Sequence, residues 1–231
     1  MPKVRKPPKS KPQQLLVEGK NDRHVIWALC EKYQVPETFS VEVPRAEAGQ
    51  GIEVLLADLP FKLREDNLRT LGIVVDADED VSSRWDAVRN RLRYSGYENF
   101  PASPPAEGWV YSPPDSNLPK VGVWLMPNNQ LPGMLEDFVA HLIGPDDKLL
   151  PFAKSILQQI EEAGINQYSL VRRPKALIHT WLAWQEAPGM PMGQAITARV
   201  LSYDGAIASD FVAWLKRLLS SSSQTGEPGS T

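Results

Sequence analysis

The chain has 231 residues, of which 42% are hydrophobic, and a formal net charge of −3. This length is enough for one α/β domain with a small addition, and the hydrophobic content excludes a chain that is disordered throughout. The single cysteine, Cys30, excludes a disulfide framework and a zinc site built from thiolates. The net charge gives no overall attraction to nucleic acid.

Both ends of the chain have the composition of flexible segments. Residues 1–12 form a proline-rich leader with five basic residues and no acid, which leaves a formal charge of −8 on the rest of the chain. We expect this leader to be a solvated arm, although it could contact phosphates. We expect residues 220–231 to be a disordered tail. The basic start lacks the apolar stretch of a secretory signal, and no apolar run is long enough to span a membrane, so the sequence predicts a soluble cytoplasmic protein.

Strands and helices are predicted to alternate between residues 13 and 145. Short apolar or alternating runs predict four strands, at 14–18, 39–43, 71–75 and 121–127. Apolar residues at helical spacing predict four helices, at 21–33, 52–63, 81–96 and 133–144. Residues 100–119 are rich in proline and are expected to form a long loop around a short GWVY segment. The alternation predicts an α/β domain with a mostly parallel sheet flanked by helices.

The pattern changes after residue 145, where no further strong strand is predicted. Helices are expected instead, at 149–163, 175–185, 194–200 and 206–219. We interpret residues 146–219 as a helical appendage that packs on the sheet rather than as an independent domain.

Acidic residues follow the predicted strands. Glu18 ends the first strand and Gly19 follows at once, Asp76 and Asp78 come after the third strand, and Glu136 comes after the last. The carboxyl ends of parallel strands lie on one edge of the sheet, so these acids are expected to converge. Crowded carboxylates resist ionisation unless a cation neutralises them, and oxygen-only ligation suits Mg²⁺ or Mn²⁺. The sequence therefore predicts a metal site suited to phosphate esters.

These motifs also resemble a known superfamily. An EG pair after the first strand, followed by a DxD after a later one, resembles the Toprim domain of topoisomerases, primases and related nucleases. The stretch EGKND matches the EGxx(D/E) pattern of the OLD and ribonuclease M5-like nuclease branch, with Asp22 in its last position. The longer set LLVEGKND, VVDADED, LMPNN and GMLEDF, with PKALIHTWLAWQ downstream, looks most like a small stand-alone Toprim-like family of unknown function.

The resemblance covers about residues 13–143 and implies a Toprim-like, Rossmann-like fold. It implies that Glu18 acts as the general acid or base and that Asp76 and Asp78 bind the metal. The chain lacks the zinc cysteines of bacterial primases, room for a topoisomerase cleavage domain, and the phosphate-binding loop of an ATPase. A Mg²⁺-dependent nuclease, or a subunit that works with partners, is therefore the expected function, and the nuclease is preferred.

Other candidate residues have competing structural interpretations. Asp80 could bind metal, but its position favours an N-cap of the helix that begins at Val81. Asp22 and Glu136 could bind a second metal or simply stabilise the first turn of a helix. Five basic residues could contact a phosphate backbone or remain solvated, and these are Lys20, Arg23, Arg172, Arg173 and Lys175.

Two alternative functions remain open at this stage. The first is a non-catalytic module that binds nucleic acid or a protein partner, which the acidic body of the chain favours. The second is a phosphatase of the haloacid-dehalogenase type, because a DxD after an apolar strand is also its opening motif. That family normally carries its DxD on the first strand, with Thr or Val two places later, where this chain has Asp80.

Overall fold

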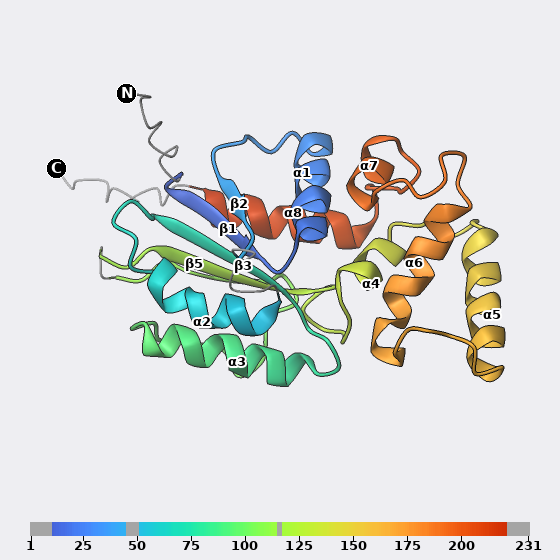
Figure 1. Cartoon of the computed structure of the whole chain (residues 1–231). Coiled ribbons are helices and arrows are strands. Elements are labelled where there is room, and N and C mark those ends of the chain that lie inside the picture. The colour runs from blue at the N-terminus through green and yellow to red at the C-terminus, as the bar shows by residue number, and fades with distance from the viewer. Residues whose placement is uncertain (1–10, 45–50, 115–116, 221–231) are drawn as a thin grey trace, which may run out of the picture.

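The computed structural model describes residues 11–44, 51–114 and 117–220. Most of the predicted leader and nearly all of the predicted tail therefore lie outside the described residues. The described chain forms a five-stranded sheet in the order β2-β1-β3-β5-β4 (Figure 1). Its strands are β1 (Gln13–Val17), β2 (Ser40–Glu42), β3 (Thr70–Asp76), β4 (Trp109–Tyr111) and β5 (Lys120–Met126).

All neighbouring strands pair in parallel except β4, which runs antiparallel to β5 at one edge. The central strands β1 and β3 are buried along almost their whole length, and most of their buried side chains are apolar, as expected of a parallel sheet covered on both faces. This mostly parallel sheet flanked by helices confirms the α/β fold class, with a Rossmann-like arrangement.

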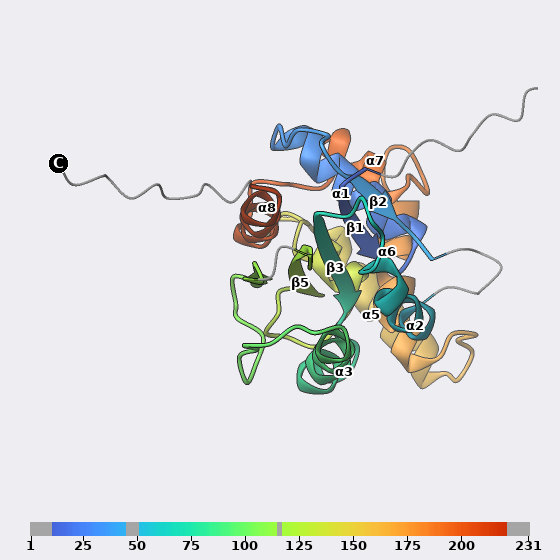
Figure 2. The ribbon, with the colours of Figure 1, turned by 90° about the vertical axis from the view of Figure 1, so that its left-hand side faces the viewer.

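Two pairs of helices cover the two faces of the sheet (Figure 2). One layer contains α1 (Lys20–Lys32) and α8 (Ala206–Leu219), and the other contains α2 (Ile52–Lys62) and α3 (Val81–Tyr94). Side chains alternate along a strand, so β1 contributes Leu15 to the first hydrophobic core and Leu16 to the second. The C-terminal helix α8 thus belongs to the main core of the protein.

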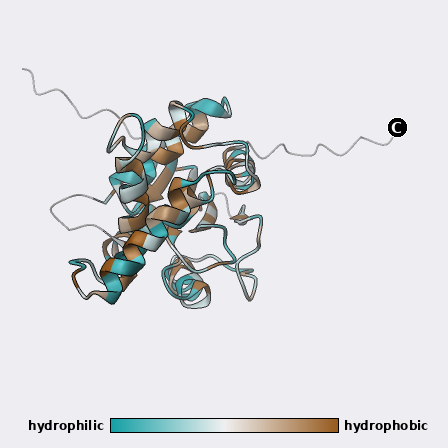
Figure 3. Ribbon diagram, turned by 90° about the vertical axis from the view of Figure 1, so that its right-hand side faces the viewer, coloured by the Kyte–Doolittle hydropathy of each residue, from teal (hydrophilic) through white to brown (hydrophobic). Residues whose placement is uncertain are grey.

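The helices between β5 and α8 lie beyond the carboxyl edge of the sheet. They are α4 (Leu135–Ala140), α5 (Leu149–Glu162), the 3₁₀ turn η2 (Leu170–Arg172), α6 (Arg173–Ala183) and α7 (Met192–Thr197). Helices α5 and α6 pack on each other around a small apolar cluster, α6 also contacts α4, and α7 packs on α1. Figure 3 shows that the helices on this side of the molecule carry both hydrophobic and hydrophilic residues. None of the described helices is long and apolar enough to cross a lipid bilayer.

The helix expected at 133–144 is shorter in the structure, where α4 begins only at Leu135. Gly133 has a φ of +137° and exchanges two backbone hydrogen bonds with Asp78, so it belongs to the preceding loop. In contrast, α6 begins two residues earlier than expected, because Pro174 is well tolerated in the first turn of a helix. The expected helix end at Gly96 is confirmed, since Gly96 has a φ of +93° just after α3.

The strand order creates a switch point in the sheet. From β1 the chain passes through α1 to β2 on one side, and from β2 it returns through α2 to β3 on the other side of β1. Ligands of open α/β sheets bind in the crevice where successive connections diverge in this way. Glu18 follows β1 and Asp76 ends β3, so both acids lie at the switch point.

Replacement of Gly108 by alanine tests how strongly α8 is built into the core. A Cβ at Gly108 would lie 2.4 Å from Cδ1 of the buried Trp214 on α8, whereas a Cβ at Gly189 would meet nothing within 4 Å. The two glycines have φ values of +79° and +76°, so both substitutions carry the same backbone strain of roughly 1–2 kcal/mol. We expect Gly108→Ala to lower the free energy of unfolding by about 1–3 kcal/mol more than Gly189→Ala in urea denaturation. Equal losses would contradict tight packing at this position.

Candidate functional site

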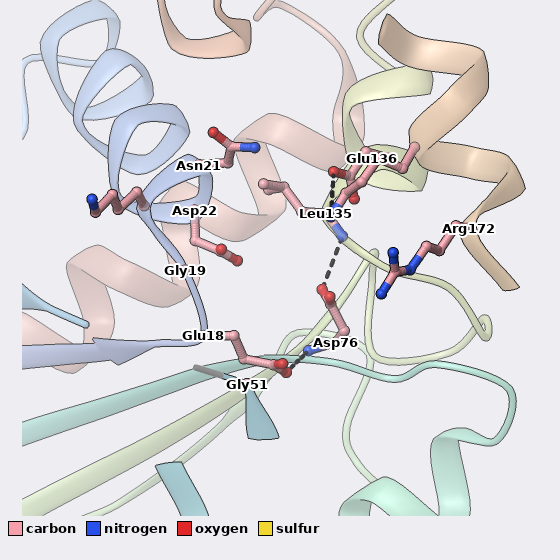
Figure 4. A pocket seen from close by; sticks show the side chains of 11 residues that line it. Glu18, Gly19, Asn21, Asp22, Gly51, Asp76, Leu135, Glu136 and Arg172 are labelled. Carbon is pink, nitrogen blue, oxygen red and sulfur yellow. Dashed lines mark hydrogen bonds and ion pairs between the residues drawn. The ribbon is translucent and has the colours of Figure 1, made fainter. Parts of the chain in front are cut away.

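Four carboxylates from separate segments line one pocket of about 640 Å³ at the switch point (Figure 4). Glu18 follows β1, Asp22 lies in the first turn of α1, Asp76 ends β3, and Glu136 lies in the first turn of α4. The structure therefore brings together four of the six acids that the sequence singled out as metal ligands.

Backbone amides fix two of these carboxylates. The amide of Asp76 donates a hydrogen bond to Oε1 of Glu18 at 2.8 Å, and the amide of Leu135 donates to Oδ1 of Asp76 at 2.9 Å (Figure 4). These two bonds tie β1, β3 and the start of α4 to one another. Each bond uses one oxygen of its carboxylate, so the other oxygen could bind a metal ion or a substrate.

Burial in the pocket raises the pKa of three of its acids. It raises the pKa of Asp76 well above its usual range, and the charges of Glu18, Asp22 and Glu136 raise it further. Burial is also the main reason why the pKa of Asp22 rises to about 7. The pKa of Glu18 is raised by burial, although the amide of Asp76 and the guanidinium of Arg84 oppose this. A cation in the pocket would therefore favour the ionised form of these three acids.

The donor set of the pocket fits a hard divalent cation. Asp22 is only 6% exposed, and its Oδ1 accepts no hydrogen bond from the protein within the described residues. An unpartnered buried carboxylate oxygen is costly unless a cation or water satisfies it. Among the residues that the structure describes, no group of three or more Asp, Glu, His or Cys side chains is arranged to hold a metal ion. Mg²⁺ usually takes one or two protein carboxylates and completes its coordination with water or substrate, and the carboxylates of this pocket could supply such ligands.

Three of the five predicted phosphate-binding residues line the same pocket, and these are Lys20, Arg172 and Lys175. The guanidinium of Arg172 points into the pocket from the η2 turn (Figure 4). Lys175 approaches Glu136, with 3.5 Å between Nζ and Oε1. Helix α6 and the turn before it thus place positive charge opposite the strand-end acids.

The other two predicted phosphate-binding residues do not line this pocket. Nε of Arg173 donates to both carboxylate oxygens of Glu161, at 2.9 and 3.0 Å. Arg23 is partly buried on α1, where its amide hydrogen-bonds to the carbonyl of Gly19.

Asp78 and Asp80 line a neighbouring pocket of about 450 Å³ rather than the acid pocket. Asp78 has a φ of +54°, its backbone pairs with Gly133, and its side chain forms an ion pair with Arg84. Asp80 accepts hydrogen bonds from the amides of Ser82 and Ser83, which confirms its expected role as the N-cap of α3. Hydrogen bonds from the Ser83 hydroxyl and from these two amides lower the pKa of Asp80.

Sequence reasoning missed three residues that organise the site. Arg84 binds Asp78. The sequence could have indicated Arg84 by its position one turn into the helix that Asp80 caps. The amide of Leu135 binds Asp76, which no side-chain motif can reveal. The buried Asn129 accepts from the Leu125 amide at 2.7 Å and donates to the carbonyl of Ala106, and so fixes the loop before α4. In the sequence, only its place in the LMPNN stretch could have singled out Asn129.

The raised pKa values predict that stability without divalent cations falls as the pH rises. In the folded protein Asp22 keeps its proton up to a pH of about 7, whereas its ordinary value is 3.8. The folded state therefore binds more protons than the unfolded state in this window, and stability is lost as the pH passes from about 4 to 7. Asp22 alone accounts for up to about 4 kcal/mol of this change.

The measurement is thermal unfolding from pH 4 to 8 in the presence of a chelator. We expect Asp22→Asn to flatten the decline, because the amide does not ionise, and the exposed control Asp210→Asn to leave it unchanged. A wild-type protein whose stability rises over this range would contradict the electrostatic description of the pocket.

Comparisons with known proteins identify the family of this chain but do not indicate an activity. The sequence model of a family described as a protein of unknown function (DUF3226) matches residues 12–220. No curated protein matches the chain, and no solved structure matches it. Because the family match spans nearly the whole chain, including every residue of the acid pocket, the chain belongs to the DUF3226 family.

Proposed function

We propose that this protein is a Mg²⁺- or Mn²⁺-dependent nuclease of the Toprim type. The observation that carries the proposal is the convergence of Glu18, Asp22, Asp76 and Glu136 in one pocket at the switch point of the sheet. The order of the EG and DxD motifs, which resembles Toprim nucleases, supports the same conclusion. The nearby Lys20 and Arg172 supply the positive charge that a phosphodiester requires.

Each group in the pocket can be given a role in phosphodiester hydrolysis. Asp76, with Asp22 or Glu136, would hold the divalent cation, which neutralises charge on the phosphate and lowers the pKa of a bound water. Glu18 is fixed by the Asp76 amide, and burial raises the pKa of its carboxyl above the usual range, which suits it to accept or donate a proton. Arg172 points into the pocket and would orient the phosphate.

The phosphatase alternative is less well supported by the geometry. Residues two apart on an extended strand point to the same side, so a DxD at a strand end would be expected to direct both aspartates into one site. Here Asp78 pairs with Arg84 and lines the neighbouring pocket, whereas Asp76 lines the acid pocket. The two aspartates therefore face different spaces.

A non-catalytic module that binds nucleic acid or a protein partner is the second candidate. One observation favours it: Lys175 already lies beside Glu136 in the acid pocket. Such a module would retain binding after loss of the acids, whereas the nuclease would not retain cleavage.

A cleavage assay with matched variants tests the nuclease. Single- and double-stranded DNA and RNA would be incubated with wild type in Mg²⁺ and in Mn²⁺. We expect Glu18→Gln and Asp76→Asn each to lower the cleavage rate by at least roughly a hundredfold, because one removes the proton carrier and the other a metal ligand. The exposed controls Glu162→Gln and Asp210→Asn carry the same chemical changes far from the pocket and should cleave normally. Absence of cleavage by wild type, or cleavage that survives both site substitutions, would favour the binding module.

Substitution of Asp78 tests which of the acids bind the metal ion. The resemblance assigns it to the metal, whereas the structure pairs it with Arg84. If that ion pair persists in the metal-bound protein, Asp78→Asn will weaken Mn²⁺ binding by less than about threefold, and Asp76→Asn by more than about tenfold. Isothermal titration calorimetry measures both affinities. An equal loss in the two variants would mean that Asp78 leaves Arg84 to bind the cation.

A further inference from the structure

The basic side chain of Lys175 makes an ion pair with Glu136, one of the acids of the pocket. Its Nζ lies 3.5 Å from Oε1 of Glu136, whose side chain is only 4% exposed. Glu136 lies in the first turn of α4 and Lys175 in the first turn of α6, and the two helices pack together. The contact between these helices therefore brings an ammonium group to a buried carboxylate at the wall of the pocket.

The two partners of this ion pair differ in mobility. The Lys175 side chain is 52% exposed and has a flexible four-carbon stem, whereas Glu136 is held in a buried position on α4. The separation of 3.5 Å is longer than the 2.7–2.9 Å of a strong charge-assisted hydrogen bond. By contrast, Arg173 binds Glu161 through two contacts, at 2.9 and 3.0 Å. The Lys175 ammonium can therefore leave its partner at a smaller cost than Arg173 can.

The pocket needs more positive charge than Lys175 supplies. Asp22, Asp76 and Glu136 influence one another's charge, and Oδ1 of Asp22 is buried without a hydrogen-bond partner among the residues that the structure describes. A single half-exposed ammonium cannot reach all of these oxygens, whereas a divalent cation beside Glu136 would neutralise them more completely.

We propose that Lys175 is an internal counter-cation of the acid pocket, which competes with a divalent cation for Glu136 and so sets the affinity of the site for metal. The inference rests on the proposed function only in taking the pocket as a divalent-cation site, and it does not require nuclease activity. Lys175 stabilises the acids in the metal-free protein and is displaced when the cation binds. Metal affinity is thereby lowered by a residue that lies outside the EG and DxD motifs of the sequence.

Mn²⁺ binding to variants of Lys175 tests this competition by calorimetry at constant ionic strength. Lys175→Met keeps the length of the side chain and its helix propensity but removes the charge, so we expect Mn²⁺ to bind roughly tenfold more tightly. Lys175→Arg keeps the charge and should bind within about twofold of wild type. Lys154→Met makes the same charge change on α5, away from the pocket, and should also remain within about twofold.

Three results would overturn the proposal. Unchanged or weaker Mn²⁺ binding by Lys175→Met would show that the ammonium does not compete with the cation. Equal tightening in Lys154→Met would reveal only a change in overall charge. Failure of both wild type and Lys175→Met to bind Mn²⁺ would remove the site altogether. Tighter binding by Lys175→Met in a protein that cleaves no nucleic acid would leave the competition standing and defeat only the nuclease.

Discussion

The burial of several carboxylates at the carboxyl edge of the sheet is the constraint on which the rest of the structure depends. Each buried acid costs free energy, and mutual repulsion among Glu18, Asp22, Asp76 and Glu136 adds to this cost. The fold offsets part of it with the amides of Asp76 and Leu135. An arrangement that lowers stability without a ligand is typical of a functional site rather than of packing.

The helices after β5 complete this site in two different ways. Helix α8 packs against β3, β4 and β5 and stabilises the sheet whose edge carries the acids. Helices α5 and α6 instead lie beyond that edge, and α6 with its preceding turn brings Arg172 and Lys175 to the pocket. The acids thus come from the Rossmann-like part of the chain, and most of the opposing charge comes from the later helices.

Much of the fold was predictable because local patterns determine it. The apolar runs predicted the strands around Leu15, Ile73 and Val123 within one or two residues, and the acids at their ends were expected at one edge of the sheet. The pairing of polar side chains was not predictable. Asp78 binds Arg84 and Arg173 binds Glu161, because tertiary contacts rather than sequence spacing decide which partner each charge meets.

The separation of Asp76 from Asp78 shows how backbone geometry divides a short motif. In an extended strand, residues two apart point to the same side, so DxD suggests two carboxylates directed at one ion. The strand ends at Asp76, and Asp78 adopts a φ of +54° that is fixed by its paired bonds to Gly133. This turn directs Asp78 to Arg84, whereas Glu136 from α4 lines the acid pocket. The acids of the candidate metal site therefore come from the ends of two strands and the first turns of two helices, and Lys175 on α6 brings a positive charge to one of them.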